Sequence, residues 1–120
     1  MSIEKKIYWI FTVIMSLLFF SGAVMYIFNY QRAHDFFVSL GFPVWIIYPL
    51  ASAKILGVIA ILTKYSSFLK ELAYAGFLYN SILALAAHIM VRDGEYIPAI
   101  VAIIVVCISW RYDKKISVSN

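Results

Sequence analysis

The chain has 120 residues, of which 64% are hydrophobic and only 13% are charged. A soluble domain averages about 45–50% apolar and about 25% charged residues, and a chain of this size cannot bury so many apolar side chains inside a water-exposed globule. The net charge of +4 comes from basic residues at the ends of apolar runs, as in membrane proteins. The composition therefore excludes a soluble domain, and we expect a lipid bilayer rather than nucleic acid as the partner.

The first apolar run extends from residue 8 to residue 28 and predicts a membrane-spanning helix. Lys5 and Lys6 precede it as in a signal peptide, but the run is longer than the about 7–15 apolar residues of such a peptide. We therefore expect a retained helix that acts as a signal anchor.

The connection that follows, residues 29–41, is the least regular part of the chain. Phe36, Phe37 and Leu40 have helical spacing within it, which predicts a short amphipathic helix lying in the membrane interface. An ordinary loop whose phenylalanines touch lipid is the alternative.

Three more apolar runs predict membrane-spanning helices over residues 44–62, 70–91 and 96–112, since about 17–25 residues cross a bilayer. Pro43 and Pro98 stand where a helix start tolerates proline, and residues 92–95 form a polar turn. The predicted fold is a single all-α membrane domain, residues 1–120: a bundle of four transmembrane helices with a short interfacial helix in the first connection.

The distribution of lysine and arginine predicts the orientation in the membrane. Seven of these residues lie in the N-terminal tail, the second connection and the C-terminal tail, and two lie in the other connections. By the positive-inside rule, both termini are expected in the cytoplasm, with the chain in a bacterial inner (cytoplasmic) membrane.

Lys54 is the residue that lipid penalises most, because it lies in the middle of helix 44–62. An ammonium group there costs about 2.5–3.5 kcal/mol on insertion scales. The acid expected nearest to it is Glu71, and we predict that the two side chains approach each other across their helices. Two interpretations stay open: an ion pair that only pins the hairpin, and a ligand or proton role.

Tyr74 and Asn80 are further candidate polar residues on helix 70–91. Tyr74 lies three residues after Glu71 and is placed to donate to it or to a ligand carbonyl. Asn80 belongs to a face of mostly small residues, which predicts close helix packing with a hydrogen bond across the interface. This face consists of Ala73, Gly76, Asn80, Ala84 and Ala87.

Two histidines, His34 and His88, are predicted on the same side of the membrane. No carboxylate or cysteine joins them at ligand spacing, so we expect neither a metal nor haem, and we interpret them as interfacial and packed side chains. Serine-histidine-acid sets, zinc motifs and phosphate loops are missing from the sequence, so catalytic residues are unknown and we expect no independent enzyme activity. With a single cysteine, Cys107, a redox role would need a bound cofactor or a partner.

Four motifs in order along nearly the whole chain resemble the DoxX-like family of small bacterial four-helix membrane proteins. They are Phe20-Ser21-Gly22, Gly41-Phe42-Pro43, Lys54-Ile55-Leu56-Gly57 and Lys70-Glu71-Leu72-Ala73-Tyr74-Ala75-Gly76-Phe77. The sequence departs from the family at Leu72, where tryptophan is frequent, which is an interfacial change.

The resemblance implies an association with quinone-linked sulfur oxidation or with thiol and oxidative-stress redox systems. It implies a hydrophobic small molecule, a quinone, bound inside the bundle near Lys54 and Glu71, where a cation and a phenol can donate to its carbonyls. Lys54, Glu71, Tyr74 and Gly76 match the family's recurrent polar and glycine positions.

Two alternatives to this redox-accessory role stay open. One is a small transporter of an anionic or neutral solute, since a central lysine suits an anion. The other is a membrane assembly subunit without chemistry of its own. Because four helices shield Lys54 poorly, a homodimer or a partner in a redox complex is also an expectation.

Overall fold

A computed structural model gives the structure of the chain and describes residues 2–118, without the side chain of residue 118. It confirms the all-helical class. The elements in order are α1 (Ile3–Phe28), α2 (Tyr30–Leu40), a 3-10 turn (Val44–Ile46), α3 (Ile47–Thr63), α4 (Ser67–Val91) and α5 (Ile97–Val118).

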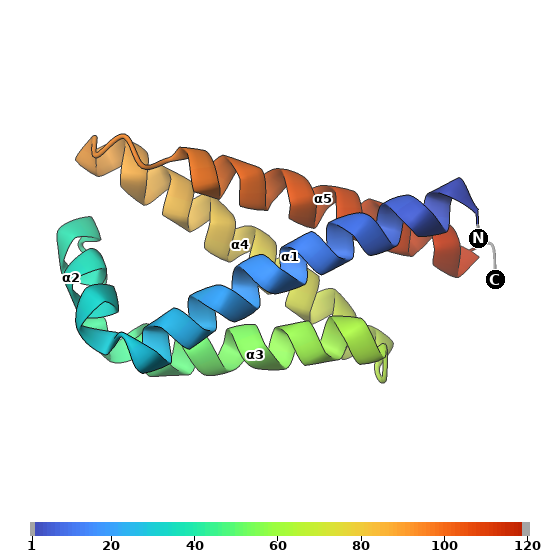
Figure 1. Cartoon of the computed structure of the whole chain (residues 1–120), viewed down its shortest axis with the longest axis horizontal. Helices are drawn as coiled ribbons and strands as arrows, with labels where there is room; N and C mark the ends of the chain where they lie inside the picture. The colour runs from blue at the N-terminus through green and yellow to red at the C-terminus, as the bar shows by residue number, and fades with distance from the viewer. Residues whose placement is uncertain (1, 119–120) are drawn as a thin grey trace.

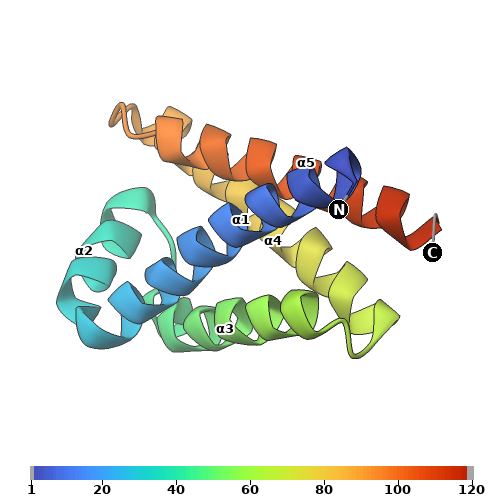
Figure 2. The ribbon, with the colours of Figure 1, turned by 45° about the vertical axis from the view of Figure 1, so that its right-hand side comes forward.

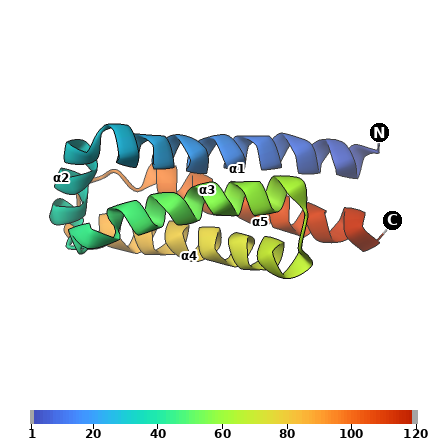
Figure 3. The ribbon, with the colours of Figure 1, turned by 90° about the horizontal axis from the view of Figure 1, so that it is seen from below.

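The four long helices form an antiparallel bundle in which each packs against two others. Going around the bundle, α1 contacts α3, α3 contacts α4, α4 contacts α5, and α5 contacts α1. Figure 1 shows the start of α1 and the end of α5 at the same end of the bundle. In Figure 3, a view from below, α3 and α4 lie side by side. The longest dimension of the molecule is 45 Å, which matches the about 40–45 Å of a bilayer with its headgroups.

Three of the described helical segments are long and apolar enough to cross a membrane, where four were predicted. They are Ile3–Phe28, Val44–Thr63 and Ser67–Val91. The helix α5 has 22 residues, but Arg111, Asp113 and Lys114 make its last third more polar.

Several helices extend beyond the predicted boundaries, because polar residues cap or continue them. The side chain of Ser2 accepts a hydrogen bond from the backbone N–H of Lys5 and caps α1, and Ser66 caps α4 in the same way through Leu69. Such caps satisfy backbone donors that the first turn leaves free. The helix α5 continues past residue 112 because its last turns still bury a side chain, Asp113, against the bundle.

The bundle core is formed by apolar side chains of all four long helices, among them Met15, Val58 and Val106. At its centre the rings of Phe19 and Phe77 are stacked, with centroids 4.0 Å apart. Gly57 makes room for this pair, because a Cβ at that position would lie 2.8 Å from the Phe77 ring. The glycine therefore sets how closely α3 and α4 approach.

The short helix α2 lies across the end of the bundle opposite the termini (Figure 2). Ala33 and Phe37 bury against Ile47 in a separate apolar cluster, and α2 ends at Gly41, whose φ of 81° is a left-handed conformation that glycine adopts readily. The segment is thus a helix rather than a loop, while its place in a membrane interface stays a prediction.

Candidate functional site

An apolar groove of about 820 Å³ runs along the outside of α3 and α4. On α3 its lining extends from Leu50 to Thr63, which is about 20 Å at 1.5 Å per residue. The groove is open along its length, because Leu56 and Leu72 in its walls are 65% and 56% exposed. Its size falls within the roughly 300–1,000 Å³ of small-molecule sites.

Lys54 lines this groove although its side chain is 9% exposed. Its ammonium group lies against α1, where it donates to the Tyr26 hydroxyl at 3.2 Å and lies over the rings of Tyr26 (4.3 Å) and Phe19 (5.9 Å). Gly22 lies beside it, where a Cβ would be in ordinary contact with Nζ at 3.6 Å. Lys54 is therefore a buried cation held by a phenol and two aromatic faces.

The predicted approach of Lys54 and Glu71 is wrong. Within the described residues no carboxylate lies within ion-pair distance of Lys54. Glu71 instead accepts hydrogen bonds from Lys114 Nζ at 2.6 Å and Trp110 Nε1 at 2.9 Å. The reason is the helix arrangement: the face of α4 that carries Glu71 meets α5, whereas Lys54 points from α3 to α1.

The prediction that Asn80 bonds across a closely packed interface is also wrong. Asn80 and Gly76 line the groove, a Cβ at Gly76 would meet nothing within 4 Å, and the Asn80 amide has no hydrogen-bond partner among the described residues. Three residues of the small-residue face, Ala73, Gly76 and Asn80, therefore line a groove, and Ala73 also packs against the bundle core. Asn80 thus adds an amide to a groove lined mostly by apolar side chains.

Tyr74 belongs to a different site, a buried polar cluster near the termini. Its hydroxyl is 2.7 Å from Ser109 Oγ, which is 2.6 Å from Thr12 Oγ1, and its ring is stacked on Trp110 at 5.5 Å. The expected bond from Tyr74 to Glu71 is not formed. The hydroxyl of Tyr8, also fully buried, has no hydrogen-bond partner in the described part of the chain.

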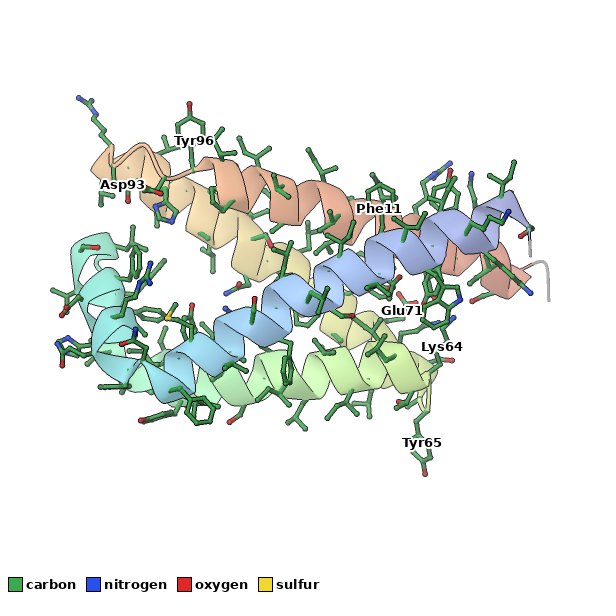
Figure 4. The ribbon with its side chains drawn as sticks, in the orientation of Figure 1. Phe11, Lys64, Tyr65, Glu71, Asp93 and Tyr96 are labelled. Carbon is green, nitrogen blue, oxygen red and sulfur yellow. The ribbon has the colours of Figure 1, made fainter. Side chains whose placement is uncertain are left out.

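The charged residue at the middle of this cluster is Asp113, whose fully buried carboxylate lies on α5. Its oxygens lie 2.9 Å from Lys70 Nζ and 3.6 Å from Lys64 Nζ. The Lys64 ammonium also lies 4.3 Å from the centroid of the Tyr8 ring. Figure 4 places Lys64 and Glu71 at this end of the bundle.

At the opposite end His88 pairs with Asp93, with Nδ1 and Oδ2 2.7 Å apart. Asp93 also accepts a hydrogen bond from the backbone N–H of Glu95, and this bond, followed by that of His88, lowers the pKa of the Asp93 carboxyl below its ordinary value. His34 lies next to Asp35 on α2. In the part of the chain that the structure describes, no three histidine, cysteine or acidic residues are grouped as metal ligands.

Asp113, Thr12 and Ser109 are the residues that the sequence analysis missed. Each pair Tyr8 and Thr12, and Ser109 and Asp113, is spaced four residues apart, which places both members on one helix face. The spacing would have indicated Asp113 if residues 113–118 had been predicted as part of the helix.

The fold and the groove define a helical protein with three described helices long and apolar enough to cross a membrane, and with a buried lysine beside an open apolar groove. The chain belongs to the DoxX-like family, whose model matches residues 10–110. The curated proteins and the solved structures contain no significant match to it.

Proposed function

We propose that this DoxX-like protein binds a hydrophobic molecule with a hydrogen-bond-accepting head in the α3–α4 groove, and that the molecule is a quinone serving a redox system. The observation that carries the proposal is Lys54, a buried cation in the wall of an apolar groove that has no carboxylate partner among the described residues. Ionisable groups inside a membrane are costly and generally functional.

The groove suits a ligand that is apolar over most of its length. Lys54 and Asn80 are polar residues of its lining, and both are hydrogen-bond donors. The Lys54 ammonium is held by the Tyr26 hydroxyl on α1, so a ligand head in the groove engages it in exchange for that hydroxyl. A donor aimed at a quinone carbonyl stabilises the negative charge that develops there on reduction. Glu71 and Tyr74 do not line the groove, so they are left out of the proposed ligand site.

The same proposal includes the placement in the membrane. The apolar residues 97–110 of α5 pack between α1 and α4, which supports α5 as a fourth spanning helix whose polar last third leaves the bilayer. The basic residues near the termini support a cytoplasmic location for both ends. The amphipathic α2 would then lie in the opposite interface of the inner membrane.

The proposal is tested with a variant in which a bulky side chain fills the groove. Retention of a short-chain ubiquinone by the detergent-purified protein is measured by native mass spectrometry. Gly76→Phe places a ring in the open space beside Gly76, and the control Ala86→Phe places the same ring on an exposed part of α4 outside the groove. We expect at least tenfold weaker binding for Gly76→Phe and no change for Ala86→Phe. Equal binding by both variants contradicts the proposal.

Lys54→Gln tests the polar end of the same site. Loss of a charge-assisted hydrogen bond predicts about tenfold weaker quinone binding, equivalent to about 1.4 kcal/mol. Uptake of a labelled organic anion by proteoliposomes, lost in Lys54→Gln, would instead favour the transporter. A protein that binds neither probe, yet is required for a partner complex to form, would favour the assembly subunit.

A further inference from the structure

One end of the groove, the end nearer the chain termini, is formed by the short linker between α3 and α4. We call this end the inner mouth of the groove. Thr63, Tyr65 and Ser66 line the groove there. Tyr65 is 91% exposed and points away from the bundle (Figure 4). Lys64 has a φ of 52°, a left-handed conformation that is strained for a lysine. This mouth of the groove therefore depends on a linker that needs support from elsewhere.

The support comes from Asp113, which pairs with Lys64 at the start of the linker and with Lys70 just beyond its end. Lys64 immediately precedes the groove-lining linker residues, and Lys70 lies in the first turn of α4. Both ammonium groups are ion-paired with the same carboxylate, at 3.6 Å and 2.9 Å. Lys64 is additionally held over the ring of Tyr8 on α1. One buried side chain of α5 thus fixes both ends of the linker.

Asp113 does this without being part of the groove. It is fully buried and does not appear in the groove lining. Neither of its oxygens has a hydrogen-bond partner of good geometry among the described residues, so the linker is held by charge at short range. Around a buried carboxylate such attraction is screened less than at the surface.

We propose that Asp113 is a positioning residue for the groove: it holds the α3–α4 linker through Lys64 and Lys70 and so keeps the inner mouth in the shape that accepts the lipophilic ligand. The inference rests on the proposed function of the groove. It assigns to the last turns of α5 the control of ligand binding at a site that they do not touch.

The test compares Asp113→Asn and Lys64→Met with Glu71→Gln. The last variant removes the charge from a carboxylate–lysine pair between the same helices, α4 and α5, that includes neither of the lysines paired with Asp113. Retention of short-chain ubiquinone is measured by native mass spectrometry, and hydrogen exchange of the backbone amides of residues 63–69 is measured on the same samples. We expect about tenfold weaker binding and faster exchange in this segment for Asp113→Asn and Lys64→Met, and neither change for Glu71→Gln.

The two readouts separate the two hypotheses. If the wild-type protein does not retain ubiquinone, the proposed function fails, whatever the linker does. If the wild type binds and Lys64→Met releases the linker but binds equally well, the positioning role is overturned. Weaker binding without faster exchange also overturns it. If Asp113→Asn does not fold, Lys64→Met carries the test, since Lys64 is one-third exposed and its loss leaves the Lys70 pair intact.

Discussion

Two parts of this small bundle handle buried charge in opposite ways. Near the termini, the buried carboxylate of Asp113 is paired with Lys64 and Lys70, and the partly exposed carboxylate of Glu71 is paired with Lys114. In the middle of α3, Lys54 has a single hydroxyl and two aromatic faces. A buried pair is expensive to break, whereas an unpaired cation is expensive to keep. The first arrangement stabilises the fold, and the second is the observation that supports our proposal of a ligand site at Lys54.

The largest expected effect is the difference in stability between removing the paired charge of Asp113 and removing the unpaired charge of Lys54. Asp113→Ala leaves Lys64 and Lys70 without their partner and is expected to lower the free energy of unfolding by about 3 kcal/mol, because a lone charge stays buried. Lys54→Met removes a costly cation and is expected to leave stability unchanged or to raise it by about 1 kcal/mol. Reversible unfolding in mixed detergent and dodecyl sulfate micelles measures both values.

A stability loss of about 3 kcal/mol in Lys54→Met as well would remove the contrast between the two regions. It would mean that Lys54 is structural glue, which favours the assembly subunit. Lys70→Met is the matched control, since it removes a lysine of similar burial from the paired cluster and is expected to behave like Asp113→Ala.

The next effect concerns the buried hydroxyls of the cluster. Ser109→Ala removes the group that lies between Thr12 and Tyr74, leaving two buried hydroxyls without that partner. Each buried unsatisfied group costs about 1–3 kcal/mol, so a loss of about 2 kcal/mol is expected in the same unfolding assay. Ser21→Ala is the control, because that exposed serine bonds only to a carbonyl of its own helix. Equal losses for both serines would contradict the role of the cluster.

A smaller effect is expected at the Lys54 site. Tyr26→Phe removes the one hydroxyl bound to Lys54 Nζ but keeps the ring beneath it. A single hydrogen bond of this kind contributes about 1 kcal/mol, and the freed ammonium gains a donor for a ligand. We therefore expect slightly lower stability and unchanged or tighter ubiquinone binding. Weaker binding would show that Tyr26 itself contacts the ligand.

The sequence predicted the helices well and the polar contacts poorly, for a physical reason. Hydrophobic runs and the penalty for charge in lipid single out Lys54 and the four long helices without any knowledge of packing. They do not tell which neighbouring helix a given helix face contacts. The sequence therefore predicts a contact of Glu71 with Lys54, whereas in the bundle Glu71 faces Lys114. Asp113 was not predicted, because a polar C-terminal segment is typical of a tail outside the bundle. Its four-residue spacing from Ser109 is nevertheless that of two residues on one helix face.

The smallest expected effect is at the exposed end, where Asp93 pairs with His88 outside the bundle. Because the backbone N–H of Glu95 and the imidazole lower the pKa of Asp93, the folded state favours its ionised form. That contribution to stability is present above the unfolded pKa of about 3.9 and is lost as the pH falls through the lower folded value. Wild type should therefore be slightly more stable than Asp93→Asn at pH 7, and the difference should vanish in acid. Thermal unfolding of both proteins from pH 7 to pH 3 measures it. A difference as large as that of Asp113→Ala would show that ion-pair strength in this bundle does not depend on burial, and the contrast between paired and unpaired buried charge would lose its physical basis.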